Sequence, residues 1–292
     1  MVDYQGKVAV VTGAASGIGR SLALDFARCG MNVVVADVEE VPLKDLVEEI
    51  AALGAESRGS GGRKGEDQGP RALAVHTDVS DLDAVEALAD AAFGEFGAVH
   101  VLCNNAGVTA GGLPLTEVTH RDWQWVLGVN LWGVVHGVEA FLPRMLAQGA
   151  PGHIINTASI LGQAVLWPRT APYVTSKYAV VGLSEALALE LEGTNLRVIV
   201  ICPGSVDTQI YDAERNRPEA FAVNRDALDL RGRMAAVSAR WESAEAVSAR
   251  VLRAMERGSM YVFTDPENTA RVDERFDRVR QDYSTAEPLD ED

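Results

Sequence analysis

Lys7-Val-Ala-Val-Val-Thr-Gly-Ala-Ala-Ser-Gly-Ile-Gly19 is the stretch that decides the fold of this chain. Its first half is a run of mostly β-branched apolar residues, which is typical of a strand buried on both faces of a parallel sheet. The three glycines of the second half let the backbone turn sharply and leave its N–H groups uncovered. Apolar residues then recur at helical spacing as far as Arg28. We therefore predict a strand, a glycine-rich turn and a helix N-terminus, where free N–H groups and the helix dipole favour a diphosphate.

A second valine-rich strand, Asn32-Val-Val-Val-Ala-Asp37, follows this helix and ends in an acid 20 residues after Gly17. A carboxylate in that position accepts hydrogen bonds from both ribose hydroxyls of an adenosine and repels a 2′-phosphate. The unit predicts dinucleotide binding, with NAD favoured over NADP. The glycines alone would also fit an ordinary tight turn, and their G-x-x-x-G-x-G spacing differs from the commoner G-x-G-x-x-G.

Length and composition limit the class of protein. The 292 residues, 47% of them apolar, suit one large α/β domain. The formal charge of −16, from 26 basic and 42 acidic residues, makes nucleic acid and anionic membranes poor partners. We find no run of about 18 apolar residues for a membrane span and no basic region of a signal peptide. The three cysteines lack metal-ligand spacing, so we expect no metal site and a reducing cytoplasmic location.

Strand and helix patterns alternate along the rest of the chain. They predict an α/β fold, a Rossmann-type doubly wound parallel sheet of about seven strands in three α/β/α layers. Expected strands lie at 7–12, 32–37, 72–77, 99–103, 153–157, 195–202 and 260–263, and expected helices at 20–28, 42–53, 81–96, 122–146, 173–191, 243–257 and 266–283. We expect one domain over 1–265, a glycine-rich mobile surface loop over 55–70, and a C-terminal helix with an acidic tail over 266–292.

Polar or glycine residues follow six of the predicted strands. In doubly wound sheets ligands bind beyond the carboxyl ends of the strands, so these residues should share one rim. They are residues 13–19, Asp37, Asp78, residues 104–107, Ser159 and residues 203–204. Asn130, in the apolar middle of a predicted helix, needs hydrogen-bond partners.

Tyr173 and Lys177 are four residues apart, so they share one face of a predicted helix. An ammonium near a phenol favours the phenolate and lowers the tyrosine pKa from about 10, which prepares it to exchange a proton with a hydroxyl or carbonyl. The Tyr-x-x-x-Lys pattern is common on helix surfaces. Ser159 alone would fit an ordinary strand end, and Asn130 alone a satisfied buried amide. The functional interpretation depends on their occurring together with the nucleotide half.

Taken together, these motifs resemble the short-chain dehydrogenase/reductase family in its single-domain branch. The resemblance covers about 6–204 and depends on Thr12-Gly13-x-x-x-Gly17-x-Gly19, Asp78, Asn104-Asn105-Ala106-Gly107, Asn130, Ser159, Tyr173-x-x-x-Lys177, and Pro203-Gly204 followed by Thr208. The larger sugar-epimerase branch would have G-x-x-G-x-x-G instead.

The resemblance implies a role for each residue. Tyr173 would be the general acid/base, Lys177 would lower its pKa and hold the nicotinamide ribose, Ser159 would bind the substrate oxygen, and Asn130 would support a water-mediated proton path. Asp78 would lie by the adenine, and Thr208 would touch the carboxamide or diphosphate. The implied cofactor contacts are Gly13, Ser16, Gly17, Ile18, Gly19, Asp37, Asp78, Val79, Asn105, Ala106, Gly107, Tyr173, Lys177, Pro203, Gly204, Val206 and Thr208.

The expected function is that of an NAD-dependent oxidoreductase acting on a secondary alcohol or ketone of moderate size. The resemblance also implies a lid over 205–240 and a homodimer or homotetramer. An apolar pocket is expected from Leu113, Leu115, Ile160, Leu161, Val165, Leu166 and Trp167. A catalytically silent, NAD-responsive binding protein of the same fold is the alternative. A hydrolase is disfavoured, because no G-x-S-x-G motif surrounds Ser159.

Overall fold

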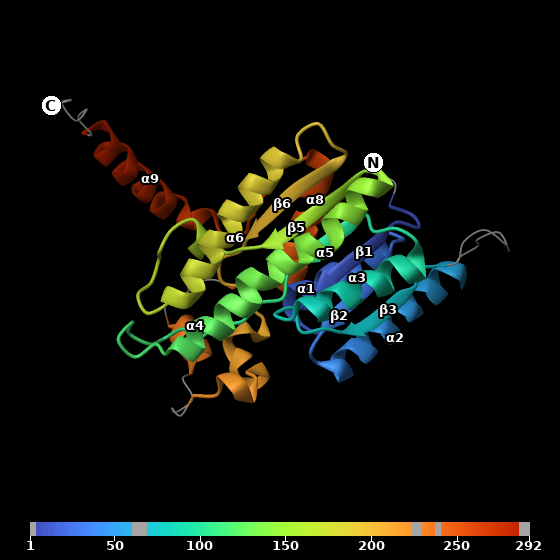
Figure 1. Ribbon diagram of the computed structural model, residues 1–292, viewed down its shortest axis with the longest axis horizontal. Coiled ribbons are helices and arrows are strands. Elements are labelled where there is room, and N and C mark those ends of the chain that lie inside the picture. Colours follow the sequence, from blue (N-terminus) through green and yellow to red (C-terminus); the bar gives the residue numbers. More distant parts are fainter. Residues whose placement is uncertain (1–3, 60–68, 224–228, 237–240, 286–292) are drawn as a thin grey trace.

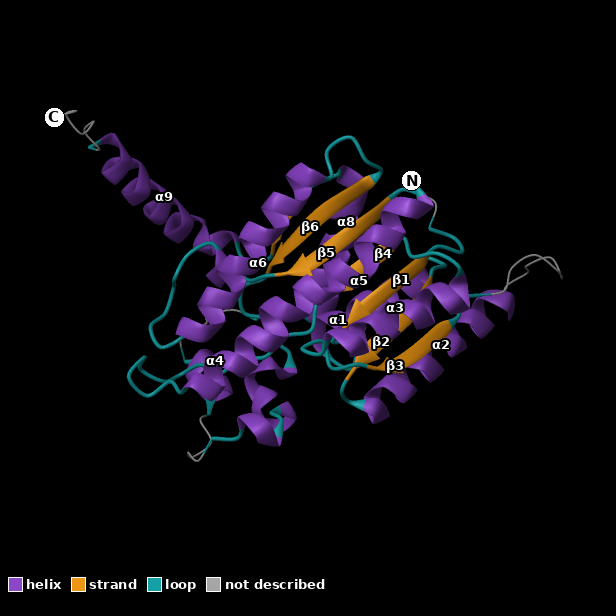
Figure 2. Cartoon of the chain, viewed as in Figure 1, coloured by secondary structure: helices purple, strands orange, loops and turns teal. Residues whose placement is uncertain are grey.

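The computed structural model describes residues 4–59, 69–223, 229–236 and 241–285. Within these residues the chain forms one parallel sheet of seven strands, in the order β3-β2-β1-β4-β5-β6-β7, with helices on both faces (Figures 1 and 2). This confirms the predicted Rossmann-type doubly wound sheet. The strands are β1 Val8–Thr12, β2 Asn32–Asp37, β3 Ala72–His76, β4 Val101–Asn104, β5 Gly152–Thr157, β6 Leu196–Cys202 and β7 Tyr261–Phe263.

The described helices follow the strands, mostly within a few residues of the predicted bounds. They are α1 Gly17–Arg28, α2 Glu40–Gly59, α3 Leu82–Phe96, α4 His120–Leu127, α5 Gly133–Gln148, α6 Ala171–Glu190, α7 Leu230–Ala235, α8 Ala244–Arg257 and α9 Thr269–Ser284. Side chains cap the N-termini of two of these helices, since Asp81 accepts from the Asp83 N–H before α3 and Ser243 accepts from the Ala246 N–H before α8.

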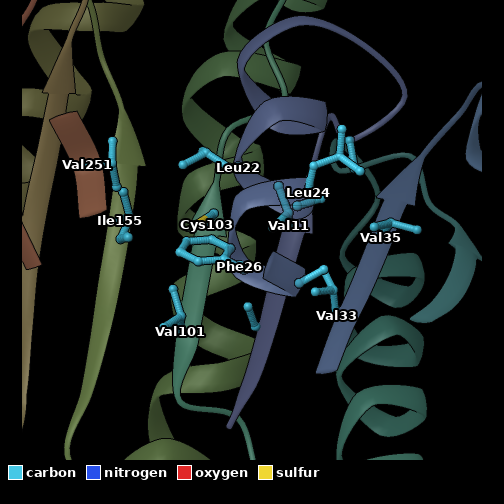
Figure 3. Close-up of a cluster of buried hydrophobic side chains, with 14 of the residues drawn as sticks. Val11, Leu22, Leu24, Phe26, Val33, Val35, Val101, Cys103, Ile155 and Val251 are labelled. Atoms are coloured by element: carbon cyan, nitrogen blue, oxygen red, sulfur yellow. The ribbon is translucent and has the colours of Figure 1, made fainter. Parts of the chain in front are cut away.

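Two apolar cores hold the helices on the sheet, because alternate side chains of each strand point to opposite faces. On one face, α1, α2 and α8 cover residues such as Val11, Val33 and Ile155, with Phe26 at the centre (Figure 3). On the other face, α3, α5 and α6 cover Val10 among others. All five residues of β1 are buried, because helices cover both faces of the sheet at this strand.

One helical segment runs from 120 to 148 and includes a π-helical stretch, Gly128–Trp132, between α4 and α5. Asn130 lies in that stretch, and such local widening is frequent at functional sites. By length and composition the segment is apolar enough to cross a membrane, with a mean hydropathy of 1.3 in its most apolar part. In this structure 44% of that part is buried, and Phe141 and Met145 of the segment belong to the apolar core on one face of the sheet.

Helix α2 differs from the prediction. It continues through Gly54 to Gly59, so residues 55–59 are helical and the predicted loop over 55–70 is wrong there. Gly54 does not end the helix. A second chain segment passes close to it, because a Cβ atom on Gly54 would lie 3.3 Å from the Pro70 carbonyl oxygen and one on Gly69 would lie 2.6 Å from the Gly54 Cα. Residues 60–68 of the predicted loop lie outside the described residues.

Candidate active site

A cleft lies at the carboxyl ends of the strands, where the strand order reverses between β1 and β4. This is the place where doubly wound sheets bind ligands. Of the sequence-predicted site residues, Gly19 and Asn130 are not in its lining. The others all line it, namely Gly13, Ser16, Gly17, Ile18, Asp37, Asp78, Val79, Asn105, Ala106, Gly107, Ser159, Tyr173, Lys177, Pro203, Gly204, Val206 and Thr208.

The glycine-rich turn needs its three glycines for close approaches. Gly13 and Gly17 have φ of +65° and +54°, in the left-handed region that disfavours side chains. A Cβ atom on Gly13 would lie 2.7 Å from the Ala106 Cα, and one on Gly17 would lie 2.9 Å from the Thr208 side chain. A Cβ atom on Gly19 would lie 2.1 Å from the Gly13 carbonyl oxygen. Gly19 thus shapes the turn from behind.

The N-terminus of α1 fits a bound anion. The helix begins at Gly17, its first turn has no acidic residue, and the side chain of its N-cap residue, Ser16, makes no capping hydrogen bond. The first N–H groups of a helix have no partner within the helix, and the helix dipole is positive there. These features together with the glycines suit the diphosphate of a dinucleotide.

Asp37, at the end of β2, lies at the wall of the same cleft. Its Oδ2 atom accepts from the Ala15 N–H at 3.0 Å and its Oδ1 atom accepts from the Glu39 N–H at 3.2 Å. Burial raises the pKa of the Asp37 carboxyl, and the two N–H donors act in the opposite direction. Two carboxylate oxygens keep further lone pairs for ribose hydroxyls, so the residue fits the adenosine half of NAD.

Asn105 joins the ends of three strands under the cleft. Its N–H donates to Thr12 Oγ1 at 3.0 Å, its Nδ2 donates to the Thr12 carbonyl at 3.0 Å, and its Oδ1 accepts from Thr157 Oγ1 at 3.1 Å. Thr12 was not among the predicted site residues, although it stands in the glycine motif. Its hydroxyl also accepts from the Ala106 N–H, so it fixes the loop that forms the cleft floor.

Ser159, Tyr173 and Lys177 meet in the cleft from β5 and α6. Ser159 Oγ donates to the Pro203 carbonyl at 3.4 Å and accepts from the Leu161 N–H at 3.1 Å, and its hydroxyl lies near enough to Tyr173 to lower the pKa of that phenol. The buried Lys177 Nζ donates to the Thr157 carbonyl at 2.8 Å and lies 5.5 Å from the centre of the Tyr173 ring. Three groups able to bind an oxygen or move a proton thus lie together beside the glycine-rich turn.

The predicted pKa of Tyr173 needs correction. The sequence led us to expect a lowered value, whereas withdrawal of the phenol from water raises the pKa of Tyr173 in this structure. The neighbouring Ser159 hydroxyl lowers this pKa in part, and the nearby Tyr211 raises it further. Burial also lowers the pKa of Lys177 to about 8, which weakens the ammonium that was expected to favour the phenolate.

Asn130 is buried below the cleft, and both the oxygen and the nitrogen of its side-chain amide are hydrogen-bonded. Its Oδ1 accepts from the Val108 N–H at 2.8 Å, and its Nδ2 donates to the Val108 carbonyl at 2.9 Å and to Ser176 Oγ at 3.0 Å. The amide therefore ties the π-helical stretch to α6 and to the segment after Gly107. A Cβ atom on Gly107 would lie 3.5 Å from Asn130 Oδ1 and 3.6 Å from Lys177 Nζ.

Two ion pairs that the sequence did not indicate connect the segment after β6 to the cleft walls. Arg215 binds both oxygens of Glu39 at 2.9 and 3.0 Å, at the end of the cleft where Asp37 lies. Arg217 binds Asp122 of α4 at 3.0 Å, and both side chains are almost fully buried, at 5% and 0% exposed. The partners are 176 and 95 residues apart in the chain, so no local pattern points to them.

The apolar wall of the cleft differs from the predicted one. None of the seven predicted pocket residues lines the cleft. Ile160 and Leu161 are buried in a separate core cluster, and Leu115 and Val165 are each 62% exposed. The apolar lining instead comes from Val108, Trp125, Val129, Ile210, Tyr211, Ala213 and Pro218. Arg217 covers the Trp125 ring at 4.0 Å, so the ion pair with Asp122 also supports this wall.

Comparisons with known proteins agree with this geometry. Residues 7–219 match the family model described as short chain dehydrogenase. The chain is 36% identical to the 1-deoxy-11-beta-hydroxypentalenate dehydrogenase of Streptomyces avermitilis, over 95% of this chain and 92% of that protein. It is 31% identical to the CLA biosynthesis dehydrogenase/reductase of Lactiplantibacillus plantarum, over 97% and 96% of the two chains.

A solved structure gives the same result. A short chain dehydrogenase/reductase from Burkholderia phymatum, in complex with NAD, is 39% identical, covers both chains completely and has a TM-score of 0.86. The chain belongs to the short-chain dehydrogenase/reductase family of oxidoreductases.

Proposed function

We propose that this protein is an NAD-dependent dehydrogenase that oxidises a secondary alcohol to a ketone, or catalyses the reverse reaction. The observation that carries the proposal is the meeting of Tyr173, Ser159 and Lys177 in the cleft that begins at the glycine-rich turn. The glycine-rich turn fits the diphosphate of a dinucleotide, and Asp37 fits its adenosine half. Bound NAD would supply the hydride acceptor, and NADH the hydride donor.

The side chains would act on the substrate oxygen. In oxidation, Tyr173 Oη removes the hydroxyl proton while Ser159 Oγ donates a hydrogen bond to the oxygen. In reduction, neutral Tyr173 returns the proton, and the two hydroxyls stabilise the developing negative charge. Lys177 Nζ, held by the Thr157 carbonyl, would bind the nicotinamide ribose and present a cation beside the phenol. Asn130 would hold α6 in register with the cleft floor through Ser176.

The preference for NAD over NADP is part of the proposal. The carboxyl groups of Asp37 and Glu39 both line the cleft and would repel a 2′-phosphate on a nearby ribose, and Arg215 is already engaged by Glu39. The substrate is proposed to be largely apolar, because Val108, Trp125, Val129 and Ile210 form the remaining wall. The relative named for a hydroxypentalenate, a name that denotes a hydroxyl group on a carboxylate, is consistent with a substrate that bears a hydroxyl group.

The proposal is tested by following NAD⁺ reduction at 340 nm with a panel of secondary alcohols, cyclic and linear, and with NADP⁺ as the control. We expect turnover with NAD⁺ and a kcat/KM at least about tenfold lower with NADP⁺. Equal rates with both cofactors would contradict the role of Asp37. NAD⁺ binding without turnover of any alcohol, or of the matching ketones with NADH, would favour the silent, NAD-responsive alternative.

A further inference from the structure

Helix α9 extends away from the body of the protein and points to the C-terminus (Figure 1). None of its 16 residues is buried. Three large apolar side chains on it are exposed, namely Phe276 at 41%, Val279 at 49% and Tyr283 at 83%. Val272, at its base, packs against the core cluster that includes Trp167 and Tyr178. The base of α9 is therefore fixed to the body, and within the described residues the apolar side chains of its remaining part stay exposed.

The four apolar residues of α9 form a seam. Val272, Phe276, Val279 and Tyr283 are separated by four, three and four residues, which is the spacing of positions a and d in a coiled coil. The spacing is the same from either end. Two antiparallel copies of α9 would thus place Phe276 opposite Val279 at the centre of the pair, and Tyr283 opposite Val272, which also contacts the body of its own chain.

Charged residues beside the seam distinguish the two orientations. In an antiparallel pair, Asp273 of one helix lies opposite Arg280 of the other, and Arg275 lies opposite Asp282, so each flank joins opposite charges. In a parallel pair Arg275 would lie against Arg280 and repel it. Flanking charges of this kind set the orientation of paired helices.

We propose that α9 pairs antiparallel with α9 of a second copy of this chain. The charge pattern and the seam spacing select a second copy, because both are complementary to themselves. Four apolar side chains from each helix bury less surface than the roughly 1,600 Å² of a standard protein–protein interface. The pair is therefore a weak, concentration-dependent contact, which also depends on salt because its flanking charges are exposed.

The pairing also has a consequence for the candidate active site. Val272 packs in the same cluster as Trp167 and the partly buried Tyr173. Arg275 lies over the ring of Tyr178 on α6, at 5.3 Å from its centre. The pairing brings Tyr283 of the second copy against Val272, so association adds an aromatic side chain beside the helix that bears Tyr173 and Lys177.

The test is a charge reversal in the full-length protein, measured by sedimentation velocity across a range of concentrations at low salt. Asp273→Arg and Arg280→Asp each place like charges opposite each other on the same flank. Each should weaken association by roughly tenfold, since each reverses two symmetry-related pairs. Arg278→Asp makes the same charge change as Arg280→Asp on the outer side of α9 and should leave association unchanged.

A mixture of the two single variants decides the partner. Asp273→Arg carries arginine at both positions of the flank and Arg280→Asp carries aspartate at both, so an equal mixture should associate as well as the unchanged protein. The double variant, Asp273→Arg with Arg280→Asp, should also associate as well as the unchanged protein. Unchanged association in the single variants would overturn the proposal. The proposal would also be overturned if both single variants lost association and their mixture did not recover it, because α9 would then dock on a different surface.

Discussion

Lys177 Nζ lies 5.5 Å from the centre of the Tyr173 ring and is held there by a 2.8 Å hydrogen bond to the Thr157 carbonyl. The bond joins α6 to the end of β5, so sheet and helix together set the position of the cation relative to the phenol. A buried ammonium fixed in this way is expensive to maintain without a function, since burial disfavours its charge.

The first prediction concerns pH. Oxidation requires Tyr173 without its proton, and the surroundings raise the pKa of Tyr173 above its ordinary value. The deprotonated fraction is then small at neutral pH and grows as pH increases, so the rate of alcohol oxidation should rise from neutral to alkaline pH. Ketone reduction uses the protonated phenol and should not show this rise. A flat oxidation profile, with hydride transfer rate-limiting by a deuterium isotope effect, would contradict the assignment.

Ser159→Ala should move that profile. The Ser159 hydroxyl lowers the pKa of Tyr173, so removal of this hydroxyl should shift the rise in oxidation rate to higher pH. It should also reduce kcat by about a hundredfold, because one donor to the substrate oxygen is lost. Ser243→Ala, which removes the N-cap hydroxyl of α8, serves as the control and should leave the pH profile in place. A lower rate with an unshifted profile would assign Ser159 to substrate binding alone.

Asp37→Asn tests the cofactor preference. Loss of the charge weakens hydrogen bonds to ribose hydroxyls and removes repulsion of a 2′-phosphate. We expect the KM for NAD⁺ to rise about tenfold and the preference over NADP⁺ to shrink. Glu40→Gln makes the same charge change at an exposed position of α2 and should alter neither value. An unchanged NADP⁺/NAD⁺ ratio in Asp37→Asn would contradict the role of this carboxylate.

The Arg217–Asp122 pair should stabilise the fold. Arg217→Ala removes the buried cation that binds Asp122 and covers the Trp125 ring, which should reduce the free energy of unfolding by about 3 kcal/mol in chemical denaturation. Arg271→Ala removes an ion pair whose side chains are 65% and 61% exposed. That control should cost less than about 1 kcal/mol. Equal losses in the two variants would show that the Arg217 pair contributes no more than a surface contact.

Much of the fold and of the site followed from local sequence. Continuous valine runs indicated strands buried on both faces, and Gly13 and Gly17 indicated a turn that a Cβ atom would obstruct. Because parallel strands end at one edge, the residues after them were correctly expected to share a cleft. Asn130 was expected to need partners, and Val108 and Ser176 provide them.

The remaining features depend on contacts that are distant in sequence. The helix expected over 42–53 continues as α2 to Gly59, and Gly54 and Gly69 approach each other closely where two chain segments pass. The pairs Arg215–Glu39 and Arg217–Asp122 join segments that no periodicity relates. The direction of the Tyr173 pKa was wrong because spacing on a helix reports a neighbouring charge but not how far both groups are withdrawn from water.

The central claim is that the Tyr173 hydroxyl moves the proton, and Tyr173→Phe tests it most directly. The change removes one oxygen and keeps the ring, so NADH binding, followed by fluorescence titration, should stay within about twofold while kcat falls about a thousandfold. Tyr178→Phe, on the same helix, should retain both NADH binding and turnover. Turnover by Tyr173→Phe within about tenfold of the unchanged protein, or loss of NADH binding together with turnover, would contradict the account.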